Sequence, residues 1–203
     1  PPPSGGGKGG KGGDSLASWL PPPGEFDLYA IALQEASQAK AWHKALQRHF
    51  LGGGGNAKGG GSGAYAVLGK AQLWLEIHLI VVARSELVRD KRLSQVGTAT
   101  EATGFAHVLG NKGGAGVCVT VDGTTRLAFV SAHLAARAER MHRRRENYEE
   151  ICHGFKGWRA DGQASGSGRG VEWMQGFDHV IWMGDLNYRV DLGVGAAGTG
   201  EEF

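Results

Sequence analysis

Four short clusters of polar residues along this chain carry side chains that could do chemistry. Each cluster follows or interrupts an apolar run of the length expected for a buried strand. Carboxylate, amide, imidazole and ammonium groups all occur among them, and that inventory fits Mg²⁺-assisted hydrolysis of a phosphate ester. The clusters are Gln34-Glu35, Gly110-Asn111-Lys112-Gly113-Gly114, Ser131-Ala132-His133-Leu134 and Gly184-Asp185-Leu186-Asn187-Tyr188-Arg189.

The cluster nearest the C-terminus is the densest. Residues 180–183 are apolar, Gly184 ends the run, and Asp185, Asn187 and Arg189 follow at once. Strands of α/β proteins commonly deliver site residues from their ends. The alternative is a strand followed by an ordinary Asp-Asn turn.

The other three clusters also allow structural interpretations. Glu35, at the end of a buried strand, needs a partner or a metal, or it is the first-turn acid of a following helix. Asn111 and Lys112 lie between glycines that let a backbone approach a phosphate, or they form a hairpin turn; the spacing is not that of a Walker loop. His133, between a strand and a long helix, is a site residue or a core or capping histidine.

Length and composition indicate one domain with a sizeable core. The net charge of +2 says little about partners. Cys118 and Cys152 are too few for a disulfide framework, which suits a reducing compartment. Cys118 lies in an alternating strand and Ser131 has no visible base, so a nucleophilic mechanism is poorly supported. No apolar stretch approaches the roughly 20 residues of a membrane span, and no signal peptide is visible.

Glycine is abundant, at 36 of 203 residues, and much of it lies in three patches. We interpret residues 1–14 as a Gly/Pro/Lys-rich linker and 15–203 as one domain. The patches at about 52–63 and 162–170 then read as loop insertions within that domain. The chain begins with Pro1 and ends at Phe203, soon after its densest cluster, so we expect a fragment.

Apolar periodicity predicts several strands. Residues 26–33 form a largely apolar run, typical of a buried parallel-type strand. Residues 73–83 alternate as a half-exposed strand would, which places His78 on a solvated face. Asp122-Gly123 predicts a hairpin turn. Further strands are expected at 64–68, 115–121, 125–130 and 178–183, with an edge strand or loop over 92–103.

Two helices are expected, over 36–51 and 134–155. The second has an apolar stripe made of Leu134, Ala138, Met141, Tyr148, Ile151, Cys152 and Phe155. Its other face carries Arg137, Arg140, Arg143, Arg144 and Arg145 among glutamates. The simplest interpretation of that face is a solvated, ion-paired surface, and the alternative is contact with nucleic acid. Strands mixed with two helices and a hairpin favour an α/β sandwich of sheets over a Rossmann unit.

In their order, four segments resemble the successive motifs of the inositol polyphosphate 5-phosphatases. They are D-L-Y-A-I-A-L-Q-E, G-N-K-G-G, S-A-H-L-A-A and W-M-G-D-L-N-Y-R, beginning at residues 27, 110, 131 and 182. The resemblance covers roughly residues 15–192. G-D-x-N alone is shared with Mg²⁺-dependent endonucleases and sphingomyelinases, whereas G-N-K-G-G upstream of the last two segments is more specific.

The resemblance implies an α/β fold, the four-layer α/β sandwich of the Mg²⁺-dependent endonuclease/phosphatase type. We expect that sandwich to be incomplete at both ends of this chain. The family's Thr-Trp-Asn strand near the start of the domain is missing here. Its Pro-x-Trp-Cys-Asp-Arg and Ser-Asp-His segments would lie past Phe203. For this reason we expect the 203-residue chain by itself to be inactive.

The implied activity is Mg²⁺-dependent hydrolysis of the 5-phosphate of phosphoinositides or soluble inositol polyphosphates by direct attack of water. By position, the resemblance makes Glu35 the Mg²⁺ ligand and Asp185 the group that activates the water. Asn187 would orient the water or the phosphate, and His133 would hydrogen-bond the scissile phosphate. The substrate-binding residues would be Asn111, Lys112, Tyr188 and Arg189.

The implied partners are the inositol phosphate or phosphoinositide substrate and a peripheral membrane surface, with no nucleic acid. The expected location is the cytoplasm and the cytosolic face of membranes. The apolar residues Phe105, Val108 and Leu109, beside Asn111-Lys112, would touch lipid or else pack under the hairpin. Two alternatives stay open: another superfamily phosphodiesterase such as an endonuclease, and a non-catalytic phosphoinositide-binding fragment.

Overall fold

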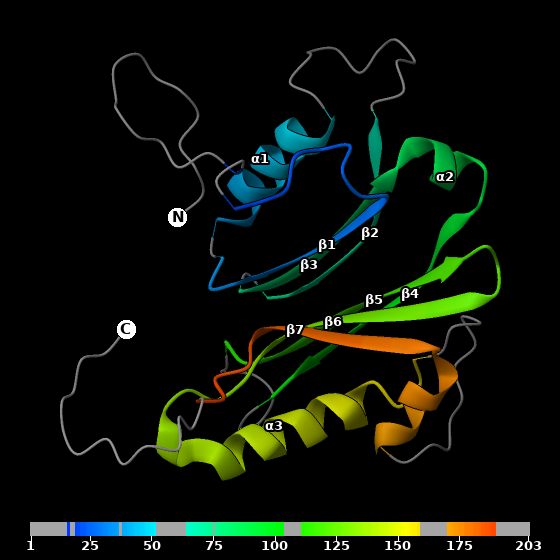
Figure 1. The fold of residues 1–203 in the computed structure, drawn as a ribbon. Coiled ribbons are helices and arrows are strands. Elements are labelled where there is room, and N and C mark those ends of the chain that lie inside the picture. The colour runs from blue at the N-terminus through cyan, green and yellow to red at the C-terminus, as the bar shows by residue number, and fades with distance from the viewer. Residues whose placement is uncertain are drawn as a thin grey trace, which may run out of the picture.

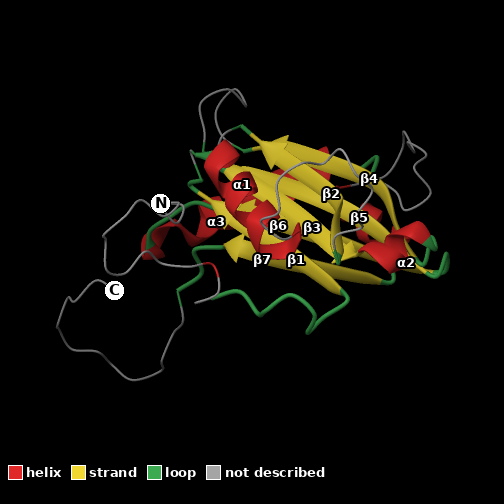
Figure 2. Ribbon diagram, turned by 90° about the horizontal axis from the view of Figure 1, so that it is seen from above, coloured by secondary structure: helices red, strands yellow, loops and turns green. Residues whose placement is uncertain are grey.

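The computed structural model consists of two β-sheets packed face to face, with one long helix on the outer face of each (Figure 1). The expected four-layer α/β sandwich is therefore confirmed. Seen from above, the strands of the two sheets run in broadly the same direction (Figure 2), as in aligned sheet packing. The structure describes residues 16, 19–36, 38–51, 64–74, 76–103, 111–158 and 170–189.

The first sheet has the strand order β1-β3-β2, with both pairings antiparallel. Its strands are β1 (Leu28–Gln34), β2 (Tyr65–Leu73) and β3 (Ile77–Arg84). Helix α1 (Ala39–Leu51) places Leu46 and Phe50, one turn apart, on the outer face of this sheet. The parallel-type strand expected at 26–33 is wrong in its pairing: β1 is antiparallel to β3, and only alternate residues are buried.

The expected half-exposed strand over 73–83 is also wrong. The chain turns at Trp74, so Leu73 ends β2 and Ile77 begins β3. All of β3 except its last residue is buried, because α1 covers one face of the sheet and the second sheet covers the other. His78 is 1% exposed instead of solvated, and its ring meets that of His43 on α1 edge to face, with centroids 5.7 Å apart.

The second sheet has the order β4-β5-β6-β7, antiparallel except for the parallel pair β6–β7. Asp122-Gly123 forms the predicted turn between β5 and β6, and β4 is the predicted edge strand. Val117 and Val119 of β5 pack against the first sheet, while Cys118 between them faces α3. The strand bounds are β4 Leu93–Ala102, β5 Gly113–Val121, β6 Thr125–His133 and β7 His179–Asp185.

The helix expected over 134–155 starts later than predicted. After His133 the backbone is non-helical as far as Arg137, a short turn η3 (Ala138–Arg140) follows, and α3 spans Met141–Gly154. Met141, assigned to the buried stripe, is 64% exposed. Arg144, assigned to the solvated face, is 2% exposed and binds backbone carbonyls instead.

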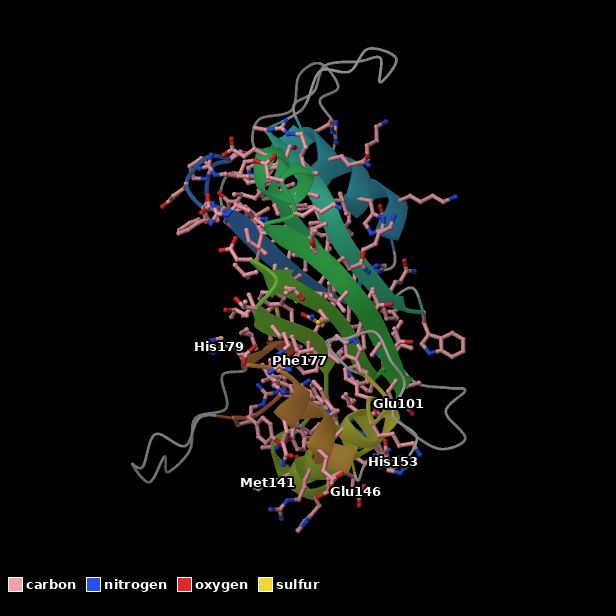
Figure 3. All side chains as sticks on the ribbon, turned by 90° about the vertical axis from the view of Figure 1, so that its right-hand side faces the viewer. Glu101, Met141, Glu146, His153, Phe177 and His179 are labelled. Carbon is pink, nitrogen blue, oxygen red and sulfur yellow. The ribbon has the colours of Figure 1, made fainter. Side chains whose placement is uncertain are left out.

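The remainder of the polar face of α3 is as expected. Arg143 pairs with Glu146 at 2.8 Å and with Glu150 at 3.1 Å. Figure 3 shows Glu146 on the side of α3 that points away from the sheets. Two short helices complete the described fold, α2 (Ser85–Arg89) and η4 (Gly170–Gly176). No helix in the described residues is both long and apolar enough to cross a membrane.

Candidate active site

The residues singled out in the sequence gather where strands of both sheets end on the same side of the molecule (Figure 1). Gln34 ends β1, His133 ends β6 and Asp185 ends β7. His133 lies opposite Asp185 in the β6–β7 register and opposite Gly113 in the β5–β6 register. Lys112 directly precedes Gly113, so it reaches this edge as well.

A side-chain hydrogen bond joins the two sheets at this edge. Gln34 Nε2 donates to Ser131 Oγ at 2.9 Å. Gly184 makes the close approach feasible: its φ is +112°, and a Cβ there would lie 2.7 Å from Gln34 Nε2 and against the backbone of Ala132. The cross-sheet bond holds the strand that carries Glu35 against the strands that carry His133 and Asp185.

His133 is the centre of the site. Its imidazole is 1% exposed, and Nε2 lies 3.4 Å from Asp185 Oδ2 and 3.9 Å from Glu35 Oε1. Lys112 Nζ also hydrogen-bonds this Nε2. Because an ammonium only donates, the imidazole accepts at Nε2 and is neutral in this arrangement.

The pKa of His133 agrees with a neutral ring. Burial lowers the pKa of His133, the charge of Lys112 lowers it further, and Asp185 and Glu35 act in the opposite direction. Burial also lowers the pKa of Lys112, opposed by the two carboxylates. The site therefore combines a neutral imidazole, a partly desolvated lysine and two carboxylates.

The two carboxylates suit a hard divalent cation. The side chains of Glu35 and Asp185 are 68% and 50% exposed, so their oxygens are accessible at the sheet edge. Mg²⁺ in proteins commonly takes one or two carboxylates and fills its other positions with water and substrate phosphate oxygens. Among the described residues no group of three or more His, Cys, Asp and Glu is placed to hold a metal ion.

Glu35 is not a first-turn acid of α1. That helix begins at Ala39 and has no acidic residue in its first turn. Glu35 instead adopts a left-handed backbone with φ +54°, an uncommon conformation for a glutamate. Such backbone outliers concentrate at functional sites, which favours the site interpretation.

Asn187 ties the chain after β7 to the chain after β6. Its φ is +55°, its backbone N–H donates to Asp185 Oδ1 at 3.2 Å, and its Nδ2 donates to the carbonyl of Leu134 at 3.0 Å. Leu134 N–H in turn donates to the carbonyl of Asp185 at 3.0 Å. In this state the amide nitrogen of Asn187 thus orients the loop after His133.

The remaining predicted residues are exposed or lie outside the described residues. Asn111 is exposed and joins the site through a backbone hydrogen bond with His133. Tyr188 and Arg189 are exposed beyond Asp185. Gly110 and the apolar residues Phe105, Val108 and Leu109 lie outside the described residues, so their expected roles stay predictions.

Some contacts that build the site were not predicted from the sequence. Gln34 and Ser131 belong to two of the polar clusters, but they are separated by 97 residues and no local pattern pairs them. Arg144 and Asn147 carry no signal beyond helical spacing, which did not indicate their burial. Cys118 was not expected to act as a nucleophile. In the structure its thiol is buried, and desolvation raises its pKa to about 12, which agrees with that expectation.

Comparison with known proteins decides the family. The model of the endonuclease/exonuclease/phosphatase family 2 matches residues 8–200. The chain belongs to this family. Within it, the chain is 34% identical over 184 residues to the human phosphatidylinositol 3,4,5-trisphosphate 5-phosphatase 1, and 32% identical over 186 residues to the 5-phosphatase 2A of Danio rerio. These alignments cover 90% and 91% of the chain but only 14% and 13% of the relatives.

A solved structure gives the same placement. The inositol polyphosphate 5-phosphatase domain of a synaptojanin, solved with inositol (1,4)-bisphosphate and a calcium ion, matches with a TM-score of 0.58 and 26% identity. The match covers 82% of this chain and 45% of that domain. The resemblance to the 5-phosphatases and the fold that it implied are thereby confirmed.

Proposed function

We propose that this chain forms part of the catalytic domain of a phosphatase. The enzyme removes the 5-phosphate from phosphoinositides or soluble inositol polyphosphates with the help of Mg²⁺. The observation that carries the proposal is the convergence of Glu35, Lys112, His133 and Asp185 on one sheet edge, with His133 Nε2 within 4 Å of both carboxylates. The similarity to 5-phosphatases supports the choice of substrate class.

The side chains divide the work according to their charge. The Asp185 carboxylate, fixed through Oδ1 by the N–H of Asn187, accepts the proton of the attacking water. Lys112 brings a positive charge to the phosphate oxygens. His133 accepts from Lys112 at Nε2 in this state, and it donates to the phosphate from Nε2 once Lys112 turns to the substrate and the ring takes up a proton there. Asn111, Tyr188 and Arg189 line the approach of a substrate that carries several phosphates. Direct attack by water needs no nucleophile from the protein.

The residues that would hold the cation are Glu35, as the principal ligand, and Asp185. When bound, Mg²⁺ neutralises the charge of the phosphate oxygens and favours attack.

The nucleic-acid alternative has fewer arginines to rest on than the sequence indicated. Arg144 is buried against carbonyls and Arg143 is paired with Glu146 and Glu150, which leaves three exposed arginines in this region, Arg137, Arg140 and Arg145. We therefore propose no second activity. A phosphoinositide-binding role without catalysis differs from the proposal only in turnover, which can be measured.

The proposed location is the cytoplasm, at the cytosolic face of membranes where phosphoinositides are presented. Two buried free cysteines suit a reducing compartment. Whether lipid or soluble inositol phosphate is preferred depends on contacts that a bilayer would make around the site.

The test is phosphate release by the full-length protein. One arm supplies vesicles that carry a 5-phosphorylated phosphoinositide, a second a soluble inositol polyphosphate, and a third supercoiled DNA. We expect release from the first two, abolished by a chelator and restored by Mg²⁺, with the DNA uncut. DNA nicking without phosphate release would favour the endonuclease, and binding without turnover would favour the binding module.

A further inference from the structure

The loop that follows His133 is held by three side chains, two from α3 and one from the segment after β7. The N–H of Ala135 donates to Asn147 Oδ1 at 3.0 Å, and the carbonyl of Leu134 accepts from Asn187 Nδ2 at 3.0 Å. Arg144 Nη1 donates to the carbonyl of Ala135 at 3.2 Å. The path of the chain just past His133 is thus set largely by α3 and by the segment after β7.

Arg144 makes the most bonds of this set. Besides Ala135, its guanidinium binds the carbonyls of Arg137 and, at 3.1 Å, of Ala138. It also lies over the ring of Tyr188, with Cζ 5.4 Å from the ring centroid. One side chain therefore contacts both the segment after His133 and the segment after Asp185.

Arg144 is buried without an acidic partner among the residues that the structure describes. The residue is 2% exposed, and within the described part of the chain no carboxylate forms an ion pair with it. Its Nε has no hydrogen-bond partner there. Burying an unpaired cation costs several kcal/mol before compensation. The planar guanidinium offsets part of this cost by donating to several carbonyls and by lying over an aromatic ring. A lysine ammonium has neither the planar shape nor as many donors for these contacts.

We propose that Arg144 is a positioning residue for the site, a role that rests on the proposed function. It holds the loop after His133 and the ring of Tyr188 on α3, and so keeps His133 Nε2 and Asp185 Oδ2 at their 3.4 Å separation. Arg144 touches neither group and acts through the backbone on which each is mounted. The competing explanation is that Arg144 only stabilises the packing of α3.

Hydrogen exchange in the full-length protein separates the two explanations without any enzyme assay. The test variant is Arg144→Lys, and the matched control is Arg145→Lys, an exposed neighbour on the same helix. We expect the amides of Leu134 and Ala135 to exchange at least about tenfold faster in the test variant, because only their local anchorage is lost. Amides of Val117 and Val119 should keep wild-type protection. Loss of protection in all four amides together would overturn the proposal.

Kinetics supply the second arm. In Arg144→Lys we expect kcat to fall about 10²-fold with KM within about twofold of wild type, because a small misplacement harms the chemical step more than binding. Arg145→Lys should stay within about twofold in both. The proposal is overturned if kcat falls only in proportion to the fraction of Arg144→Lys protein that is folded, or if kcat equals that of Arg145→Lys.

Two safeguards keep the outcome decisive. If Arg144→Lys does not fold, Tyr188→Leu removes the exposed partner of the guanidinium and should accelerate the same two amides. If the wild-type protein shows no phosphatase turnover, the proposed function fails, while the exchange arm still decides whether Arg144 anchors the loop.

Discussion

Each end of the β6–β7 strand pair carries an aspartate, and the two aspartates differ in their hydrogen-bond partners. At the end far from the site, which Figure 3 marks with Phe177 and His179, Asp178 accepts three hydrogen bonds from Arg126. These bonds lower the pKa of Asp178 to about 2. At the site end, Asp185 receives one backbone N–H at 3.2 Å and lies 3.4 Å from a neutral histidine.

This difference indicates what each carboxylate is for. Arg126 matches Asp178 in charge and geometry, so the acceptor positions of Asp178 are occupied by the bonds that join the two strands at this end. Asp185 has no arginine partner among the described residues, and Lys112, whose charge it feels, is bonded to His133. A half-exposed carboxylate with unused acceptor positions can take a proton or a cation, and Asp178 cannot without breaking its bonds.

The comparison is tested most strongly by removing each charge. Asp185→Asn should lower turnover of the full-length protein by about 10³-fold, because an amide cannot accept the proton of water. Substrate binding should persist, since the group acts in the transition state. Asp178→Asn is the matched control and should retain wild-type turnover. Equal loss of binding and turnover in Asp185→Asn would make Asp185 a structural residue.

Glu35→Gln should have the next largest effect. The substitution keeps size and removes the charge that attracts a hard cation, so the rate should fall about 10²-fold at low Mg²⁺. Raising the Mg²⁺ concentration should restore part of the loss, which a titration of initial rates would reveal. Glu86→Gln, on α2, is the control and should keep the wild-type rate at every Mg²⁺ concentration. Unchanged turnover in Glu35→Gln would remove Glu35 from the site.

Gly184→Ala tests the close approach beneath the site. Its positive φ and the contact of a new Cβ with Gln34 Nε2 and the backbone of Ala132 should lower the free energy of unfolding by about 2 kcal/mol. Gly123→Ala, at φ +70° with open space around it, measures the conformational part alone. Urea unfolding of both variants gives the difference. If the two lose equal stability, the approach at Gly184 is not tight.

The smallest effect concerns pH and the far end of the strand pair. Because the folded pKa of Asp178 lies below its usual 3.8, its stabilising contribution is complete above pH 3.8 and is lost as pH falls toward 2. The difference in urea midpoint between wild type and Asp178→Asn should therefore be present at pH 5 and shrink steadily from pH 4 to pH 2. A difference that does not change over this range would argue against the Arg126 pairing in solution.

The sequence placed the site residues near strand ends but did not show what covers the strands. Glu35, His133 and Asp185 come two or three residues after the ends expected at 33, 130 and 183, and β1, β6 and β7 extend one to three residues past those ends. The burial of His78 was predicted wrongly, because alternation cannot reveal that both faces of a sheet are covered. Arg144 was placed in solvent because helical spacing shows which residues share a face, not where a neighbouring loop leaves carbonyls to be bound.

Several expectations remain predictions. The division into a linker over 1–14 and a domain over 15–203 is one of them, and the individual roles of the site residues are others. The inactivity expected of the 203-residue chain alone is another, which a phosphate-release assay on that chain would decide.

The central claim is that this sheet edge hydrolyses the 5-phosphate of an inositol polyphosphate. Phosphorus NMR of a soluble inositol polyphosphate, incubated with the full-length protein and Mg²⁺, follows each phosphate separately. The account predicts that the 5-phosphate resonance disappears as inorganic phosphate appears, and that it persists with Asp185→Asn. Loss of a different phosphate, or an unchanged spectrum with folded wild-type protein, would contradict it.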